Sequence, residues 1–121
     1  MQLNALSIVY PAATRIAEGR KTLEIRSWQP PVLPLKDLLI VENHRRLECD
    51  GDTDPNGLAV ALVDVTHVRP WTPEDAERDG HTFAAGYHAW LLTNVRPIAP
   101  PLRVPAERLI YQVTIPKGAL A

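Results

Sequence analysis

The sequence predicts a mainly β fold of mixed α/β class, a small barrel of about six strands with two or more short helices. Its 121 residues fit a single domain. The strand-like runs are short and lie too close together for the crossover helices of a parallel sheet. The chain has 12 prolines, in clusters that separate these runs, and proline donates no hydrogen bond to a strand ladder. We therefore expect one closed or nearly closed barrel over residues 1–121.

The first expected elements are a strand over residues 4–9 and a helix over residues 11–18. The strand residues alternate between apolar and polar side chains, as in a half-buried strand. Pro11 occupies a favoured first position of a helix, and Gly19 can adopt the left-handed conformation that ends one.

Three further strands are expected over residues 22–28, 38–42 and 58–67. In the first of these, Leu23 and Ile25 alternate with polar or aromatic side chains, so the two faces of the strand differ. The second is a short apolar run typical of a buried strand, and the third is rich in valine.

A second helix is expected over residues 73–79, and two last strands over residues 89–95 and 109–115. Thr72 is a favoured residue before a helix, and acidic side chains follow it in the first turn. Residues 50–57 are acidic and contain two glycines, which predicts an exposed connection between strands.

Composition excludes several classes of protein. The chain has 13 Lys and Arg and 14 Asp and Glu, for a net charge of −1. This charge disfavours a protein that coats long RNA but permits a local basic pocket. The single cysteine, Cys49, excludes a disulfide framework or a multi-cysteine zinc site. The sequence has no apolar run of about 20 residues and no pattern of a signal peptide. We expect a cytoplasmic protein that makes no contact with a membrane.

The strongest chemical signal is a trio of charged side chains after the expected first helix. Glu24 and Arg26 share one face of the second strand, and Lys21 lies at the turn before it. Two cations beside one carboxylate are suited to gripping a phosphate, a carboxylate or a polarised carbonyl. The same spacing is also typical of a solvated ion pair on a strand surface. Spacing alone leaves both interpretations open.

The run Gly19-x-Lys21-x-x-Glu24-x-Arg26 resembles the G-x-K-x-x-E-x-R signature of the ASCH domain family, relatives of the PUA RNA-binding barrels. The helical segment 10–18 ahead of it, and the late run 90–98 with its proline-rich continuation, also resemble the family. The resemblance implies a PUA-like β-barrel with a cleft beside the signature strand, lined by Lys21, Glu24 and Arg26. Family members are thought to bind RNA or nucleotides. Some small bacterial members hydrolyse N4-acetylcytidine, and others are described as ribonucleases.

One position departs from the small amidohydrolase members. They resemble this chain at Lys21 but have a threonine at the position of Glu24, and here the nearer hydroxyl is Thr22. That active site therefore does not carry over intact. If the cleft is catalytic, Glu24 is the natural base, while Lys21 and Arg26 would stabilise developing negative charge. The hypotheses are an RNA- or nucleoside-binding protein, a hydrolase using the same cleft, and a small-molecule or partner-binding module.

Other side chains are candidates for ligand binding. Tyr10 and Trp28 offer aromatic faces on which a base can stack, although core packing is an alternative for Trp28. Asn43, His44 and Arg45 follow a buried strand and either line the cleft or form a solvated turn. Residues 50–57 mimic the start of a calcium loop but have proline in place of its glycine and no closing glutamate. We expect no metal and no cofactor.

Overall fold

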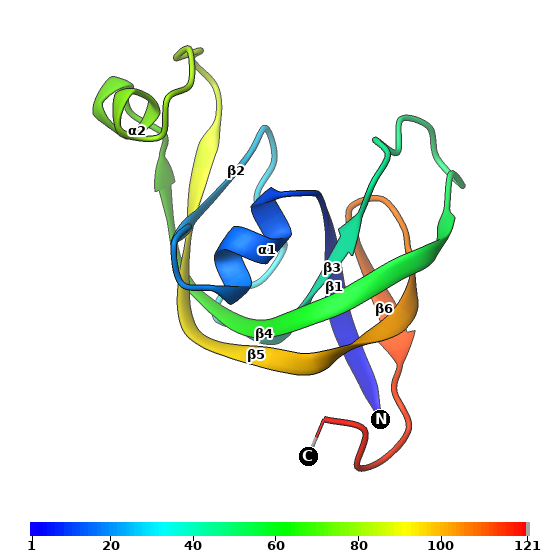
Figure 1. Ribbon diagram of the computed structural model, residues 1–121. Helices are drawn as coiled ribbons and strands as arrows, with labels where there is room; N and C mark the ends of the chain where they lie inside the picture. Colours follow the sequence, from blue (N-terminus) through cyan, green and yellow to red (C-terminus); the bar gives the residue numbers. More distant parts are fainter. Residues whose placement is uncertain (121) are drawn as a thin grey trace.

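Six strands form one sheet that curls around a short helix, as the computed structural model of residues 1–120 shows (Figure 1). The elements are, in chain order, β1 (Gln2–Val9), α1 (Ala12–Ala17), β2 (Leu23–Arg26), β3 (Leu35–Asn43), β4 (Asp54–Pro70), α2 (Pro73–Arg78), β5 (His88–Ala106) and β6 (Ile110–Thr114). Across the sheet the order is β2-β5-β4-β3-β1-β6. Only β1 and β3 pair in parallel within this range. The predicted fold class, mainly β with about six strands and two short helices, is confirmed.

The sheet is a half-barrel, because β2 and β6 are its two ends and no ladder joins them in the described chain. Figure 1 shows β4 and β5 as long, strongly bent strands that carry most of the curvature. Their ladder contains several register shifts, which are sites of β-bulges or similar irregularities. Such shifts bend a strand and increase its twist, which lets a single sheet wrap around one core.

The fifth strand runs past the expected end at residue 95 and continues through the proline-rich stretch to Ala106. Its pairing with β2 ends at Leu91, so beyond that point β5 pairs with β4 alone. A strand with one free edge tolerates proline, because the missing N–H is not needed there. Pro100 and Pro101 also lie inside a register shift, between the pairs made by Pro97 and Leu102. The prolines therefore lie within this strand, where we expected them to mark its end.

The two faces of the sheet each bury an apolar cluster. On one face, Ala13 and Ile16 of α1 pack with Leu6, Ile40 and Trp90, all fully buried. On the other, residues that alternate with these along β1 and β3 form the second cluster with two residues of β6: Ala5, Leu39, Val41, Tyr111 and Val113. This alternation explains why residues 38–41 of β3, which contribute to both clusters, form a continuous apolar run.

The second helix packs on a third, smaller cluster formed by Leu23, Trp71, Ala76 and Ala89. It begins as expected at Thr72, whose hydroxyl accepts a hydrogen bond from the Asp75 backbone N–H, while the Asp75 carboxylate accepts one from the Thr72 N–H. This reciprocal capping satisfies two of the backbone donors that a helix start leaves free.

The acidic connection is shorter than expected, because Asp54 to Gly57 already belong to β4. Gly57 faces β5 so closely that an added Cβ would lie 2.6 Å from the carbonyl oxygen of Val104. The rest of the connection is exposed apart from the half-buried Asp52, and Asp52 and Asp50 pair there with Arg45 and Arg108. No group of three potential metal ligands occurs within residues 1–120. Nor is any helix of that range long and apolar enough to cross a membrane.

Candidate functional site

A cleft of about 730 Å³ lies at the open side of the half-barrel, and we call it the seam cleft. Its walls are residues 24–28 of β2 and the chain just after it, residues 7–9 of β1, and residues 107–109 before β6. The remaining lining residues are Asn43 at the end of β3, Arg46 and Leu47 after it, Ala12 of α1, His81 and Tyr87. The cleft therefore exists because β2 and β6 do not pair.

Lys21, Glu24 and Arg26 form one ion cluster, of which Glu24 and Arg26 line this cleft and Lys21 does not. An Arg26 guanidinium nitrogen lies 3.1 Å from Glu24 Oε2, and Lys21 Nζ lies 3.9 Å from Glu24 Oε1. The Glu24 side chain is 8% exposed, against 20% for Lys21 and 25% for Arg26. The cluster carries one net positive charge, since two cations share one carboxylate. Such pairing holds the three side chains together beside the cleft.

Arg26 also bridges the seam. Its guanidinium donates a hydrogen bond of 3.0 Å to the backbone carbonyl of Ser7 in β1, on the opposite side of the opening. The Ser7 hydroxyl in turn accepts a bond from the Glu107 N–H and lies 3.0 Å from the Tyr111 hydroxyl. Side-chain hydrogen bonds thus connect β2 to β1 and β6 across the opening, where no backbone ladder joins the ends of the sheet.

Local structure explains how β2 presents this trio. Gly19 has a φ of +77° at the end of α1, a backbone conformation that glycine adopts at little cost. The carbonyl of Arg15 then accepts bonds from the N–H groups of Arg20 and Lys21, which fixes the turn into β2. Leu23 and Ile25 pack in the third apolar cluster. Strand alternation therefore directs Glu24 and Arg26 toward the cleft.

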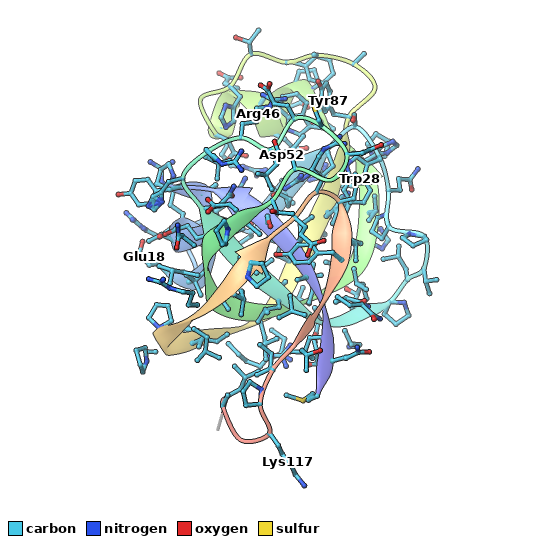
Figure 2. The ribbon with its side chains drawn as sticks, turned by 90° about the vertical axis from the view of Figure 1, so that its right-hand side faces the viewer. Glu18, Trp28, Arg46, Asp52, Tyr87 and Lys117 are labelled. Carbon is cyan, nitrogen blue, oxygen red and sulfur yellow. The ribbon has the colours of Figure 1, made fainter. Side chains whose placement is uncertain are left out.

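The two nominated aromatic residues lie in different places. Trp28 lines the seam cleft and packs edge-on against the buried Trp90 at a centroid distance of 5.0 Å. Tyr10 is 56% exposed and stacks on His44 at 5.2 Å, and it is not among the cleft-lining residues. Tyr87, which sequence analysis did not nominate, is the second aromatic side chain at the cleft. Figure 2 shows Trp28, Tyr87 and Arg46 toward the same end of the molecule.

The candidate residues at the end of β3 and in the turn after it also lie in different places. Asn43 is buried and lines the cleft, and its amide donates to the carbonyl of Arg45. The Arg45 guanidinium turns to Asp52 and the Thr53 carbonyl instead. Arg46 takes the place at the cleft wall. The predicted trio Asn43, His44 and Arg45 is therefore not gathered at one wall.

The remaining cleft residues could not be found by local pattern. Arg46 adjoins the nominated turn, so its sequence position gave a partial signal. Tyr87, Arg108 and Glu107 come from segments that carry no motif, and only the curl of the sheet brings them to β2.

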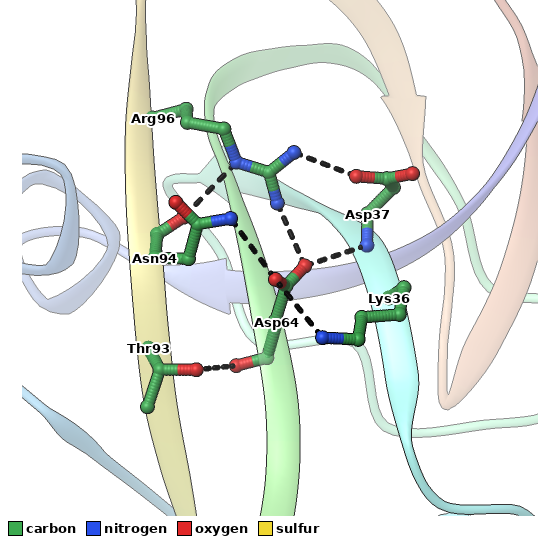
Figure 3. Close-up of polar contacts among 6 residues, drawn as sticks. All are labelled: Lys36, Asp37, Asp64, Thr93, Asn94 and Arg96. Atoms are coloured by element: carbon green, nitrogen blue, oxygen red, sulfur yellow. Dashed lines mark hydrogen bonds and ion pairs between the residues drawn. The ribbon is translucent and has the colours of Figure 1, made fainter.

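A second polar network surrounds Asp64 in β4 and is separate from the cleft (Figure 3). The buried carboxylate accepts bonds from the Asp37 N–H, the Asn94 amide and Arg96, and Lys36 lies 3.7 Å away. The backbone bond from Asp37 and the amide of Asn94 hold the pKa of Asp64 below its usual range. These contacts give the polar residues of the late run 90–98 a structural role, since they fix the bent β3–β4–β5 region.

Comparison with known proteins agrees with this architecture. The ASCH domain family model matches residues 6–102. Two crystal structures of ASCH from Zymomonas mobilis are similar, one of the protein itself (19% identity, TM-score 0.55) and one of its S128A mutant (18% identity, TM-score 0.56). Each match covers 83% of this chain and 72% of the other. No curated protein matches the sequence. With most of its length matched and its half-barrel shared with these structures, the chain belongs to the ASCH domain family.

Proposed function

We propose that the seam cleft binds one nucleotide-sized unit, either a single residue of RNA or a modified nucleoside. The observation that carries the proposal is the presence of an aromatic face, Trp28, and of the Glu24–Arg26 ion pair on the walls of one cleft. Lys21 does not line this cleft, but its Nζ lies 3.9 Å from the Glu24 carboxylate. Aromatic side chains stack on bases, and charged groups bond to their polar edges. The cleft volume of about 730 Å³ is within the usual range for small-ligand sites.

The charges around the cleft support a small ligand. Three arginines, Arg26, Arg46 and Arg108, line it together with two glutamates, Glu24 and Glu107. That is a small positive excess on a chain whose net charge is −1. Tight binding to long RNA needs many cations that neutralise phosphates. A single nucleotide or a short RNA end requires far fewer.

A hydrolase is the second candidate, and the position of Glu24 favours it. Its carboxylate lies at the cleft wall, with Lys21 Nζ 3.9 Å and an Arg26 nitrogen 3.1 Å away. Glu24 would take a proton from the attacking water, and the two cations would stabilise the oxyanion or phosphorane charge. N4-acetylcytidine and RNA are the substrates that the family resemblance suggests.

The experiment incubates the purified protein with cytidine, N4-acetylcytidine and short RNAs. Isothermal calorimetry measures binding, and mass spectrometry detects products. We expect Lys21→Ala to abolish binding or turnover. Lys117→Gln is the control, because Lys117 is exposed and lies at the opposite end of the molecule in Figure 2. If Lys21→Ala binds every nucleoside and RNA as the wild type does, the cleft is not the functional site.

Glu24→Gln separates the two candidates. A binding protein keeps affinity within about fivefold, since the amide retains one acceptor and gives up only part of a charge-assisted hydrogen bond. An enzyme that uses Glu24 as base loses about a hundredfold or more in rate, with little change in affinity.

A further inference from the structure

A second cavity, of about 400 Å³, adjoins the seam cleft, and we call it the basic pocket. Four cationic side chains line it, against a single carboxylate, that of Asp79: Arg15, Arg20, Lys21 and Arg78. His81 lines both cavities. The Lys21–Glu24 ion pair also joins them, because Lys21 lines the basic pocket and Glu24 lines the cleft.

The walls of the basic pocket have a well-defined backbone. On one side is the turn from α1 to β2, where the Arg15 carbonyl accepts bonds of 2.9 Å and 3.2 Å from the N–H groups of Arg20 and Lys21. On the other is the end of α2, where the His81 N–H donates to the Ala76 carbonyl at 2.8 Å. Two elements far apart in sequence thus face each other across the pocket, each anchored to the apolar clusters by its buried side.

The positive charge of the pocket is only partly neutralised. Arg15 has no ion-pair partner in the described chain, and Arg20 pairs with Glu18 at the exposed surface. Arg78 shares the Asp75 carboxylate with Arg69, just as Lys21 shares Glu24 with Arg26. The four lining cations and the two arginines that share their carboxylates, Arg26 and Arg69, make six positive charges. Four carboxylates face them, those of Glu18, Glu24, Asp75 and Asp79. Glu74 and Glu77 of α2 do not line the pocket.

We propose that the basic pocket holds a phosphate group attached to the nucleoside in the seam cleft. The ligand class is then a phosphorylated nucleoside or a nucleotide within an RNA strand, and not a free base or nucleoside. This inference rests on the proposed function of the cleft. Arginine groups from two sides bond to phosphate oxygens in several directions, and a pocket wall excludes part of the competing water. Because the Lys21–Glu24 pair joins the two cavities, a single nucleotide can occupy both.

The test compares ligands that differ only by phosphate. Calorimetry at fixed salt measures the affinity of the wild type for cytidine, its 5′- and 3′-monophosphates, a short oligocytidine RNA and inorganic phosphate. We expect a monophosphate to bind at least tenfold more tightly than cytidine, and the position of the preferred phosphate to show which end of the nucleoside faces the pocket. The oligonucleotide shows whether a diester phosphate is accepted as well.

Two variants assign the preference to the pocket. Arg15→Gln removes the cation that has no partner among the described residues, and Arg15→Gln with Arg78→Gln removes one cation from each wall. We expect the double variant to lose most of the preference for phosphate and to bind cytidine within twofold of the wild type. For the RNA, the slope of log K against log salt concentration should become shallower by about 0.7 for each phosphate that the variant no longer neutralises. Arg103→Gln is the matched control, an exposed arginine that lines neither cavity.

The outcomes separate this inference from the proposed function. Equal affinity of the wild type for cytidine and both monophosphates overturns the inference and leaves the nucleoside site intact. A phosphate preference that survives both variants also overturns it. If cytidine, other nucleosides and RNA all fail to bind, the proposed function fails. Binding of phosphate alone that depends on Arg15 would then support the pocket without the cleft. Circular dichroism of each variant checks that it is folded.

Discussion

Asp75 offers the sharpest test of how α2 is held beside the basic pocket. Its carboxylate accepts four hydrogen bonds: two from Arg69 at 2.6 and 3.0 Å, one from Arg78 at 2.7 Å and one from the Thr72 N–H at 3.0 Å. The side chain is 5% exposed. The perturbation is Asp75→Asn, which keeps the shape and one acceptor oxygen but removes the negative charge.

The cost follows from these hydrogen bonds. Removing one member of a buried ion pair typically costs about 3–5 kcal/mol. Arg69 and Arg78 have side chains 35% and 66% exposed. Water therefore screens part of their attraction to Asp75 and can solvate both guanidinium groups once the carboxylate is replaced. Weakening the reciprocal cap at the start of α2 adds about 0.5–1 kcal/mol. We therefore expect Asp75→Asn to lower the free energy of unfolding by about 2–3 kcal/mol at pH 7.

The same reasoning fixes the pH dependence. The hydrogen bonds from Arg69, followed by those at Thr72, hold the pKa of Asp75 far below its usual range, although burial opposes this. A carboxyl group whose pKa is lowered by folding stabilises the protein fully above its unfolded pKa, about 4. That contribution is lost as the pH falls through the folded value. The difference between wild type and variant should be constant from about pH 5 to 8 and shrink below about pH 4.

Urea denaturation followed by tryptophan fluorescence measures both effects, and Trp71 reports directly because it packs in the same cluster as Ala76 of α2. Glu74→Gln is the control: it alters an exposed carboxylate of the same first turn and should cost at most about 0.5 kcal/mol. A loss below about 0.5 kcal/mol for Asp75→Asn, or a loss that is the same at about pH 3 and pH 7, would refute the reasoning.

Two further predictions concern the sheet itself. Gly57→Ala should lower the free energy of unfolding by about 1–3 kcal/mol, because the new methyl group would meet the Val104 carbonyl at 2.6 Å and a Val41 methyl at 2.8 Å; a thermal melt unchanged from the wild type contradicts this close approach. Asp64→Asn should cost about 2 kcal/mol at pH 7, since Arg96 and the Asp37 N–H lose their charged acceptor. Because the pKa of Asp64 is lowered in the fold, this loss should diminish below about pH 4, and urea titrations at about pH 7 and pH 3 that give the same loss would exclude that role.

Several elements of the fold could be predicted from the sequence because their signals are local. Gly19 ends α1 through its own backbone freedom, and Thr72 with Asp75 begins α2 through bonds that span three residues. The alternation of Leu23 and Ile25 with Glu24 and Arg26 assigns the two faces of β2 without knowledge of its neighbours. The grouping of Lys21 with Glu24 and Arg26 and the mainly β class follow from such short-range patterns.

The prolines of β5 led to a wrong prediction of where this strand ends, because the strand's end depends on its neighbours in the sheet and not on local sequence. Pro97, Pro100 and Pro101 indicate the end of a strand, yet β5 continues through them because its outer edge is unpaired there. Similarly, the acidic turn gave no sign that Gly57 faces Val104 inside a ladder. The cost of a missing N–H, or of an added methyl group, depends on which neighbour lies opposite.

The sequence by itself determined that Lys21, Glu24 and Arg26 lie together at the start of a strand, since their separation is fixed by covalent geometry and strand period. Only the tertiary structure decided what surrounds them. Because the sheet curls and leaves β2 and β6 unpaired, Trp28, Tyr87 and Arg46 meet at one cleft, while Tyr10 and Arg45 find partners elsewhere. The tertiary structure likewise brings Arg15 of α1 and Arg78 of α2 to the walls of one pocket. These arrangements depend on contacts between residues distant in the chain, and no local pattern encodes them.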